Sequence, residues 1–242
     1  FAACALAGLV NAQVESVNVV GYLTCEIDSG AGEFMSNIGV PLKNLGAVDG
    51  AYTVSNELFS YTCQDGDTVY VFNPDNWNLD FFSYVGFDQG WSASWSDGTV
   101  TLESSFVVEP GANLFFMPAD GASSVIIAGE VAASGTQQVV FDPTDGDWMW
   151  PIVNPFPIDT TLGDIESFAV AGDTIYVFNP FNWNLDFYSY VGPGQGWSVS
   201  WSDGSVSLIT DSTTVLFPAG TGGLYMPNGD GQVRTWNVTL TY

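Results

Sequence analysis

The sequence predicts an all-β fold made of two tandem β-sandwich-like domains that arose by internal duplication. A 35-residue block occurs twice along the chain with few changes, which is the signature of a repeated structural unit. Both copies consist of short aromatic and β-branched runs separated by turn residues, as in β-sandwiches. No long stretch has the sustained 3.6-residue apolar period of a helical protein.

The repeat is strongest between residues 66–100 and 172–206, which match without a gap at 28 of 35 positions. Fainter echoes extend it in both directions: Phe34-Met35 with Trp148-Met149, Phe115-Phe116-Met117 with Leu224-Tyr225-Met226, and residues 19–23 with residues 127–131. The predicted organisation is therefore an apolar segment at 1–12, a first repeat at 13–125 and a second repeat at 126–242.

Each repeat contains one well-marked hairpin. The tryptophans and the alanine at the odd positions of residues 91–95 alternate with serine, so they share one face of a strand. The Asp-Gly pair at 97–98 predicts a two-residue turn. With that turn, Val100 and Leu102 would return to the same apolar face.

Other strands are expected at 69–72 and 79–85, which are β-branched and aromatic runs on either side of the turn-rich residues 73–76. Residues 162–168 are the one place where a short helical turn is expected. Since each repeat is about the size of one sandwich domain, each should contain its own core.

The charge balance excludes several classes of function. Charged residues make up 12% of the chain, and 27 Asp and Glu face only Lys43 and Arg234, for a net charge of −25. Nucleic-acid binding and attachment to anionic membranes are excluded because both need a basic surface. The same charge repels other copies of the chain, so self-assembly would need apolar contacts, paired strands or bound cations.

Residues 1–12 form an apolar stretch that ends in Val10-Asn11-Ala12, which fits the end of an export signal cleaved before Gln13. Twelve residues are too few for a membrane-spanning helix. The expected location is extracellular or at the cell surface. If the segment were retained, it would need an apolar surface to cover it, such as that of a neighbouring subunit.

The three cysteines fit an exported protein with at most one internal disulfide. Cys25 and Cys63 are the preferred pair because both fall in the first repeat, which leaves Cys4 over. The chain has no histidine and no Cys-x-x-Cys spacing, so a zinc site is not expected.

The motif Asn-Trp-Asn-Leu-Asp occurs at 76–80 and again at 182–186. Tryptophan can stack on a sugar ring while amide and carboxylate groups bind its hydroxyls, so the motif is a candidate glycan site. In the competing interpretation the aromatic residues fill the core and Asn and Asp cap turns. The candidate glycan contacts are Trp77, Tyr84, Trp183 and Tyr190.

Acidic turns offer weak candidates for calcium ligands, because clustered oxygen atoms in a glycine-containing loop are what calcium requires. The candidates are Asp65, Asp67, Asp145 and Asp147. None of them has the spacing of an established calcium loop, so no cofactor is expected apart from this possible calcium.

Catalysis is not expected. Without histidine the chain can form no Ser-His-Asp or Cys-His arrangement. A pair of carboxylates could hydrolyse glycosides, but the duplicated block contains no Glu and its shared Asp residues lie beside turns.

The opening Glu15-Ser16-Val17-Asn18-Val19-Val20-Gly21-Tyr22, placed just after the export signal, resembles that of a loose group of exported all-β proteins of Verrucomicrobia-type bacteria. The later Pro-Gly turn and aromatic strand at 110–116 are similar to that group too. The resemblance implies export and an all-β fold, and it assigns no catalytic or binding residue.

Together these features favour a structural subunit of an extracellular fibre, sheath or surface layer, whose partners are copies of itself. Assembly is expected through exchange of a terminal strand between copies, a form of β-augmentation. The residues expected to take part are Val14, Val17, Val19, Val20 and Tyr22. The alternative is a carbohydrate-binding or adhesive module at the cell surface.

Overall fold

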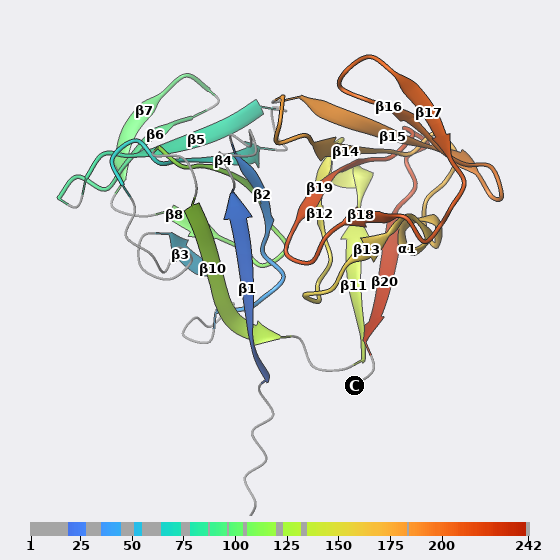
Figure 1. Ribbon diagram of the computed structural model, residues 1–242, viewed down its shortest axis with the longest axis horizontal. Helices are drawn as coiled ribbons and strands as arrows, with labels where there is room; N and C mark the ends of the chain where they lie inside the picture. The colour runs from blue at the N-terminus through green and yellow to red at the C-terminus, as the bar shows by residue number, and fades with distance from the viewer. Residues whose placement is uncertain are drawn as a thin grey trace, which may run out of the picture.

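The computed structural model describes the greater part of both repeats and shows an all-β protein of two sandwich-like units, as the sequence predicts. Figure 1 shows the two units side by side, each with a broad sheet at the top and a narrow pair of strands below. The described residues are 19–27, 35–44, 51–54, 64–73, 78–86, 88–95, 97–103, 106–119, 123–131, 135–182 and 184–240.

The described part of the first repeat contains ten strands. They are β1 (Val19–Ile27), β2 (Ser36–Gly39), β3 (Tyr52–Val54), β4 (Thr68–Asn73), β5 (Asn78–Tyr84), β6 (Trp91–Ser94), β7 (Val100–Glu103), β8 (Phe106–Val108), β9 (Asn113–Met117) and β10 (Ser123–Val131). Six of them form an antiparallel sheet in the order β2-β9-β4-β5-β6-β7, and the others pair as β1-β10 and β3-β8.

The second repeat has the same number of strands in the same order. They are β11 (Gly135–Phe141), β12 (Trp150–Val153), β13 (Thr160–Thr161), β14 (Thr174–Phe178), β15 (Leu185–Gly192), β16 (Gly196–Ser200), β17 (Val206–Ile209), β18 (Val215–Phe217), β19 (Gly222–Met226) and β20 (Arg234–Leu240). The sheet order β12-β19-β14-β15-β16-β17, with the pairs β11-β20 and β13-β18, repeats the first topology strand for strand.

The predicted helical turn is present as α1 (Leu162–Glu166), which begins at a capping box. The Thr161 hydroxyl accepts from the N–H of Asp164, and the Asp164 carboxylate accepts from the N–H of Thr161 at 2.7 Å. A short 3₁₀ helix, Pro143–Asp145, is capped in a similar way by Asp142.

The strand pairing places the division between the repeats after β10. β1 pairs with β10 along its whole length, from Val19 opposite Val131 to Ile27 opposite Ser123. The echo between 19–23 and 127–131 therefore joins two strands of one repeat, and the topological equivalent of β1 is β11. The boundary expected at 125/126 lies inside β10.

The hairpin register differs from the prediction by one residue. The N–H of Trp95 donates to the carbonyl of Thr99 at 2.9 Å, so three residues connect the strands, with Gly98 at φ +90°. A shift of one residue moves a strand's side chains to the opposite face of the sheet. Val100 and Leu102 thus lie opposite Ser94 and Ser92, on the outer face and away from the tryptophans.

The second repeat makes the same three-residue connection. Trp201 donates to the carbonyl of Ser205 at 2.9 Å, and Val206 lies opposite Ser200. Because both copies share this register, the apolar residues on the outer face are a property of the duplicated unit.

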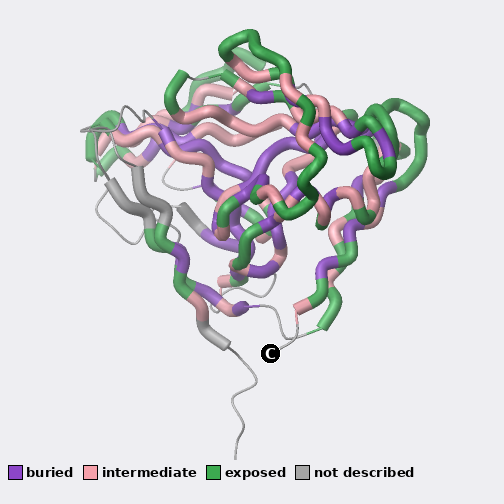
Figure 2. Tube along the Cα trace, turned by 45° about the vertical axis from the view of Figure 1, so that its right-hand side comes forward, coloured by how far each residue is buried: buried purple, intermediate pink, exposed green. Residues whose placement is uncertain are grey.

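A hydrophobic core fills each repeat between the six-stranded sheet and the smaller pairs beneath it, as the buried segments of Figure 2 show. Trp91 and Trp197 are both fully buried there, at equivalent positions of β6 and β16. In the second repeat Trp197 donates through Nε1 to Glu166 of α1 at 3.1 Å. The alternation of aromatic and serine residues therefore marks the core face correctly.

The two repeats are in direct contact. β2 of the first repeat lies against β19 of the second and against the loop that precedes β19. Asn37 Nδ2 donates to the carbonyl of Gly222 at 2.6 Å, and the N–H of Gly39 donates to the carbonyl of Gly220 at 2.8 Å. Phe115 and Phe178 pack across the same boundary with ring centroids 5.1 Å apart. The two sheets are thereby held edge to edge.

Candidate interaction surfaces

The outward side chains of the two six-stranded sheets form one surface, here called the upper face. Strand register places them on the side of each sheet opposite the buried tryptophans. In the first repeat they are Tyr70, Phe72, Leu79, Phe81, Ser83, Ser92, Ser94, Val100, Leu102 and Phe115. In the second they are Tyr176, Phe178, Leu185, Phe187, Ser189, Ser198, Ser200, Val206, Leu208 and Leu224.

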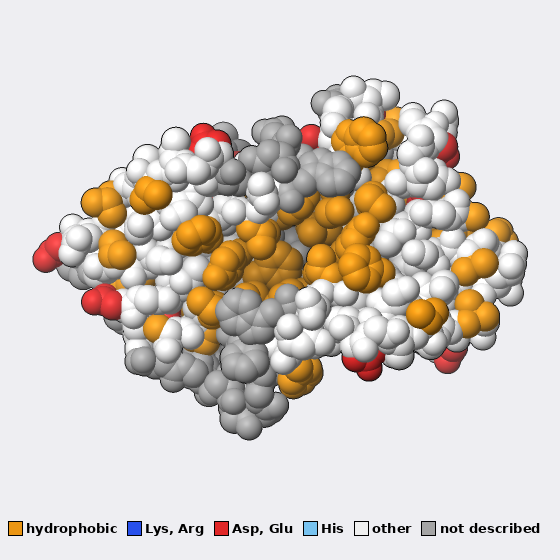
Figure 3. Space-filling model, turned by 90° about the horizontal axis from the view of Figure 1, so that it is seen from above, with side chains coloured by type: hydrophobic (Ala, Val, Ile, Leu, Met, Phe, Trp, Pro, Cys, Tyr) orange, Lys and Arg blue, Asp and Glu red, His pale blue; other side chains and the backbone are white. Residues whose placement is uncertain are grey.

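None of these outward residues is charged, although the chain carries a net charge of −25. Figure 3 looks onto this face and shows apolar side chains in its centre, with the acidic side chains that it shows at the rim. Val100, Leu102, Val206 and Leu208 are each more than 60% exposed. Exposed apolar side chains that gather on one face indicate an interaction site.

A groove of about 520 Å³ runs between the two sheets at the centre of the upper face. It is lined by matching residues of the two repeats: Met35 and Met149, Tyr70 and Tyr176, Phe72 and Phe178, Leu79 and Leu185, and Phe115 and Leu224. Asn78 adds one amide group. The groove exists only because the duplicated units lie edge to edge, so each unit alone would supply half of it.

The two groove tyrosines are held by neighbouring rings. Tyr70 lies 6.0 Å from Phe81 and Tyr176 lies 5.0 Å from Phe187, measured between ring centroids. Burial raises the pKa of both phenols above the ordinary value, so they stay neutral. The groove is therefore uncharged as well as apolar.

The structure places the predicted glycan residues differently from one another. Tyr190 is only 4% exposed and belongs to the core. Tyr84 packs against the same core and lies edge-on to Trp91 at 5.3 Å. Both tyrosines therefore take part in packing, although Tyr84 is only half-buried, while Trp77 and Trp183 lie outside the described residues.

The polar residues of the Asn-Trp-Asn-Leu-Asp motif in the second repeat tie two hairpin loops together. Asp186 accepts from the N–H of Ser202 at 2.7 Å, and Asn182 donates to the Ser202 hydroxyl at 2.8 Å. Asn179 donates to the same hydroxyl at 3.2 Å. The turn-capping interpretation of these Asn and Asp residues is thus the one that the geometry supports.

The second repeat also contains a buried ion pair. The Asp173 side chain is fully buried and lies 3.1 Å from Nε of Arg234, which is 4% exposed. Tyr225 Oη donates to the same carboxylate at 2.5 Å, and Asp230 takes a further bond from Arg234 at 2.9 Å. Burial alone would lower the pKa of Arg234, but its bonds to Asp173 and Asp230 raise it above the ordinary value.

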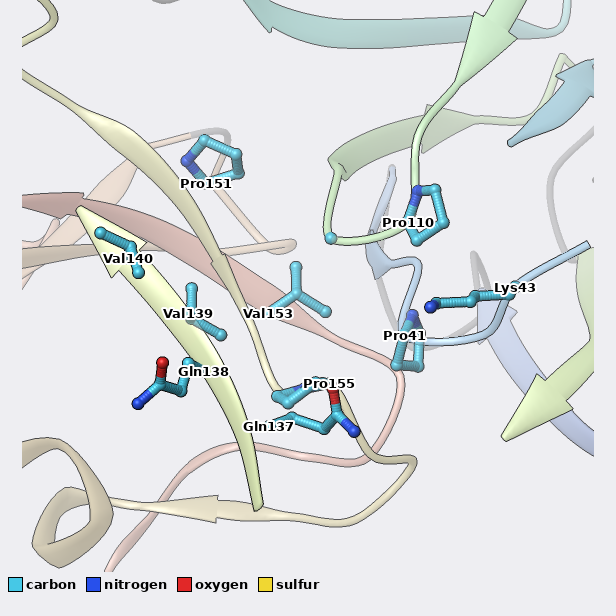
Figure 4. A pocket seen from close by; sticks show the side chains of 11 residues that line it. Pro41, Lys43, Pro110, Gln137, Gln138, Val139, Val140, Pro151, Val153 and Pro155 are labelled. Carbon is cyan, nitrogen blue, oxygen red and sulfur yellow. The ribbon is translucent and has the colours of Figure 1, made fainter. Parts of the chain in front are cut away.

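A second cleft lies beneath the boundary between the repeats and has a volume of about 300 Å³. Figure 4 shows Gln137 to Val140 of β11 along one side and Lys43 on the other. The first repeat contributes Pro41, Pro110 and Gly111 and the second contributes Pro151, Val153 and Pro155. Lys43 is exposed and forms no ion pair with any described residue.

The calcium candidates do not form a cluster in the described part of the chain. Asp67 is 2% exposed and accepts from the N–H groups of Gln64 and Ala119 at 2.9 and 2.8 Å, so it fixes two loops. Asp65 is exposed and Asp147 is half-buried, and the side chain of Asp145 is not described. Among the described residues no three acidic or sulfur side chains gather as a metal site.

The predicted disulfide and most of the predicted assembly side chains lie outside the part of the chain that the structure describes. Cys63, Val14 and Val17 lie outside the described residues, and so do the side chains of Cys25, Val19 and Val20. Tyr22 lies on β1 and is 72% exposed. Since Val19, Val20 and Tyr22 pair with β10 of their own chain, the part of the terminus left for exchange lies upstream of Val19.

The sequence interpretation missed the groove, the Arg234 network and the cleft around Lys43. Outward apolar residues alternate with core residues in β4 and β5, so the repeated block indicates an apolar outer face, although not a groove between the two units. The sequence interpretation used the two cations only in the charge balance. A lone cation in an acidic chain in itself indicates an ion pair or a functional site.

Comparisons of the chain with protein-family models, with curated proteins and with solved structures found no match. In the described part of the chain, no helix has the length and apolar character needed to cross a membrane.

Proposed function

We propose that the chain is an exported structural subunit that assembles with copies of itself into an extracellular fibre, sheath or surface layer. The observation that carries the proposal is the uncharged upper face of a chain with net charge −25. Two copies with that charge repel each other strongly unless they meet where carboxylates are absent. Terminal strand exchange supplies a second contact between copies.

The duplicated scaffold also fits a structural role. What the repeats share is the arrangement of core, hairpins and upper face, so one chain presents two equivalent apolar sheet surfaces. Contact between two such faces would bury the exposed residues of β7 and β17, whose burial contributes about 25 cal/mol per Å² of apolar area. The apolar residues of the groove would lie at the centre of that contact.

Charges introduced into the upper face should abolish assembly. The double substitution Leu102→Asp and Leu208→Asp places carboxylates on side chains that are 67% and 62% exposed, so folding should change by less than about 0.5 kcal/mol. We expect a chain that stays monomeric in sedimentation velocity at concentrations where the unmodified chain polymerises.

The matched control is Val107→Asp with Val215→Asp, which adds the same charge at exposed valines of β8 and β18, outside the upper face. This control should still assemble. Polymerisation of the Leu102/Leu208 variant at the unmodified rate, or a strictly monomeric unmodified chain at all salt concentrations, would refute the proposal.

A carbohydrate-binding role is the second candidate, and an exposed tryptophan outside the predicted motif supports it. Trp148 is 63% exposed and lines a pocket of about 220 Å³ together with Asp147, Trp150 and Pro227. An exposed indole beside a carboxylate is suited to stack on a sugar and bind its hydroxyls.

If this second role holds, Trp148→Ala should remove binding on a glycan array, because the stacking surface is lost. Phe181→Ala is the matched control, since Phe181 is an aromatic residue with 55% exposure outside that pocket. Equal loss in both variants, or no glycan bound by the unmodified chain, counts against the role.

A further inference from the structure

We propose that the cleft beneath the repeat boundary accepts residues 13–18 of a neighbouring copy, which add as a strand to the free edge of β11. This inference rests on the proposed self-assembly and names the acceptor and the donor of the exchanged strand. It makes the contact between copies heterologous, so that it can propagate into a fibre.

The acceptor is a strand edge with which no described strand pairs. β11 bonds β20 along one edge through seven residue pairs, from Gly135 to Phe141. Along its other edge, no described residue forms a main-chain hydrogen bond with it. An exposed row of N–H and C=O groups is a template for a further strand.

The walls of the cleft leave that edge available. Four of the lining residues are prolines, which have no main-chain N–H to donate. The cleft therefore offers apolar walls on the sides and hydrogen-bonding groups on β11, which is the combination that an extended peptide requires. The four prolines are Pro41, Pro110, Pro151 and Pro155.

The donor is defined by what β1 already does. β1 is committed to β10 from Val19 onward, so the adjoining residues 13–18 are the part of the terminus that another chain can take. They follow the predicted cleavage position before Gln13 and are therefore kept whether or not residues 1–12 are removed. Six extended residues span about 20 Å, which exceeds the roughly 13 Å of the four β11 residues in the cleft.

Charge supports the same pairing. Lys43 is the only lysine of the chain, and among the described residues that line the cleft it is the only charged one. Residues 13–18 also contain a single charge, the carboxylate of Glu15. A strand bound with Glu15 beside Lys43 would join these two charges and fix the register of the added strand.

The test reverses each charge in the full-length chain. Lys43→Glu and Glu15→Lys change the net charge in opposite directions, so a general charge effect would move self-association in opposite directions. We expect both single variants to associate about tenfold or more weakly, because each puts like charges together at the contact. The double variant, with the original net charge, should regain association.

A mixture of the two single variants provides the sharper arm. In a polymer in which the two variants alternate, the donor strand of each copy meets an acceptor cleft of opposite charge. The mixture should therefore form polymers that neither variant forms alone, as measured by sedimentation velocity and electron microscopy. Single reversals that leave assembly unchanged would overturn this inference while the proposed function stands. An unmodified chain that never assembles would instead refute the proposed function.

Discussion

Replacing Arg234 by alanine is expected to destabilise the second repeat by about 3–5 kcal/mol, the usual cost of breaking a buried ion pair from one side. The substitution leaves the fully buried Asp173 carboxylate without its cation. Three donors remain to that carboxylate, from Tyr225, Asn228 and Val170, but none of them carries a positive charge.

Urea unfolding followed by tryptophan fluorescence measures the loss. The free energy of unfolding of Arg234→Lys should lie between those of the unmodified chain and of Arg234→Ala. Lysine restores the charge but cannot bond Asp173, Asp230 and the carbonyl of Gln232 in the same planar geometry. Lys43→Ala is the control for removal of a cation, and it should change the free energy of unfolding by less than about 0.5 kcal/mol because Lys43 is exposed. A loss below about 1 kcal/mol for Arg234→Ala would contradict the assignment of a structural ion pair.

The bonds of Asp173 can be compared with those of the equivalent carboxylate in the first repeat. Asp67 is the equivalent carboxylate of the first repeat and accepts the same two kinds of main-chain bond. Phe116 occupies the position that Tyr225, which bonds Asp173, occupies in the second repeat. The two copies share the loop-fixing carboxylate, and in the second repeat Arg234 and Tyr225 bond it as well.

The core was predictable from the sequence because it depends on local alternation. The period-two pattern of residues 91–95 correctly identified which side chains are buried, and the capping box at Thr161 marks the start of α1. These signals involve residues close together in the chain, where side-chain periodicity and local hydrogen bonding determine the structure.

The outward position of the apolar residues of β7 and β17 was not predictable because it depends on a single residue of turn length. The Asp-Gly pair fits a two-residue turn, but the chain forms a three-residue connection, with the Asp97 carboxylate accepting from Thr99 at 2.8 Å. That one extra residue moves Val100 and Leu102 from the core face to the outside. The groove was hidden for a different reason, because it needs two units that the sequence places 106 residues apart to lie edge to edge.

Gly39→Val is expected to separate the two repeats without unfolding either of them. A Cβ at this position would lie 2.8 Å from the carbonyl oxygen of Thr221 and 2.8 Å from Cγ1 of Val153, both in the other repeat. A backbone carbonyl held in a loop cannot yield as a flexible side chain can, and overpacking of this kind costs about 1–3 kcal/mol. The bond from Gly39 to Gly220 would be lost as the strands move apart.

Small-angle X-ray scattering should show a larger radius of gyration for Gly39→Val, while far-ultraviolet circular dichroism should stay native because the strands within each repeat keep their pairing. Ser92→Val is the control, a similar replacement on β6 away from the repeat boundary, and it should leave the scattering curve unchanged. Because both the groove and the lower cleft are built from the two repeats together, Gly39→Val should also lose self-association. A separated pair of repeats that still polymerises normally would mean that neither surface between them takes part in assembly.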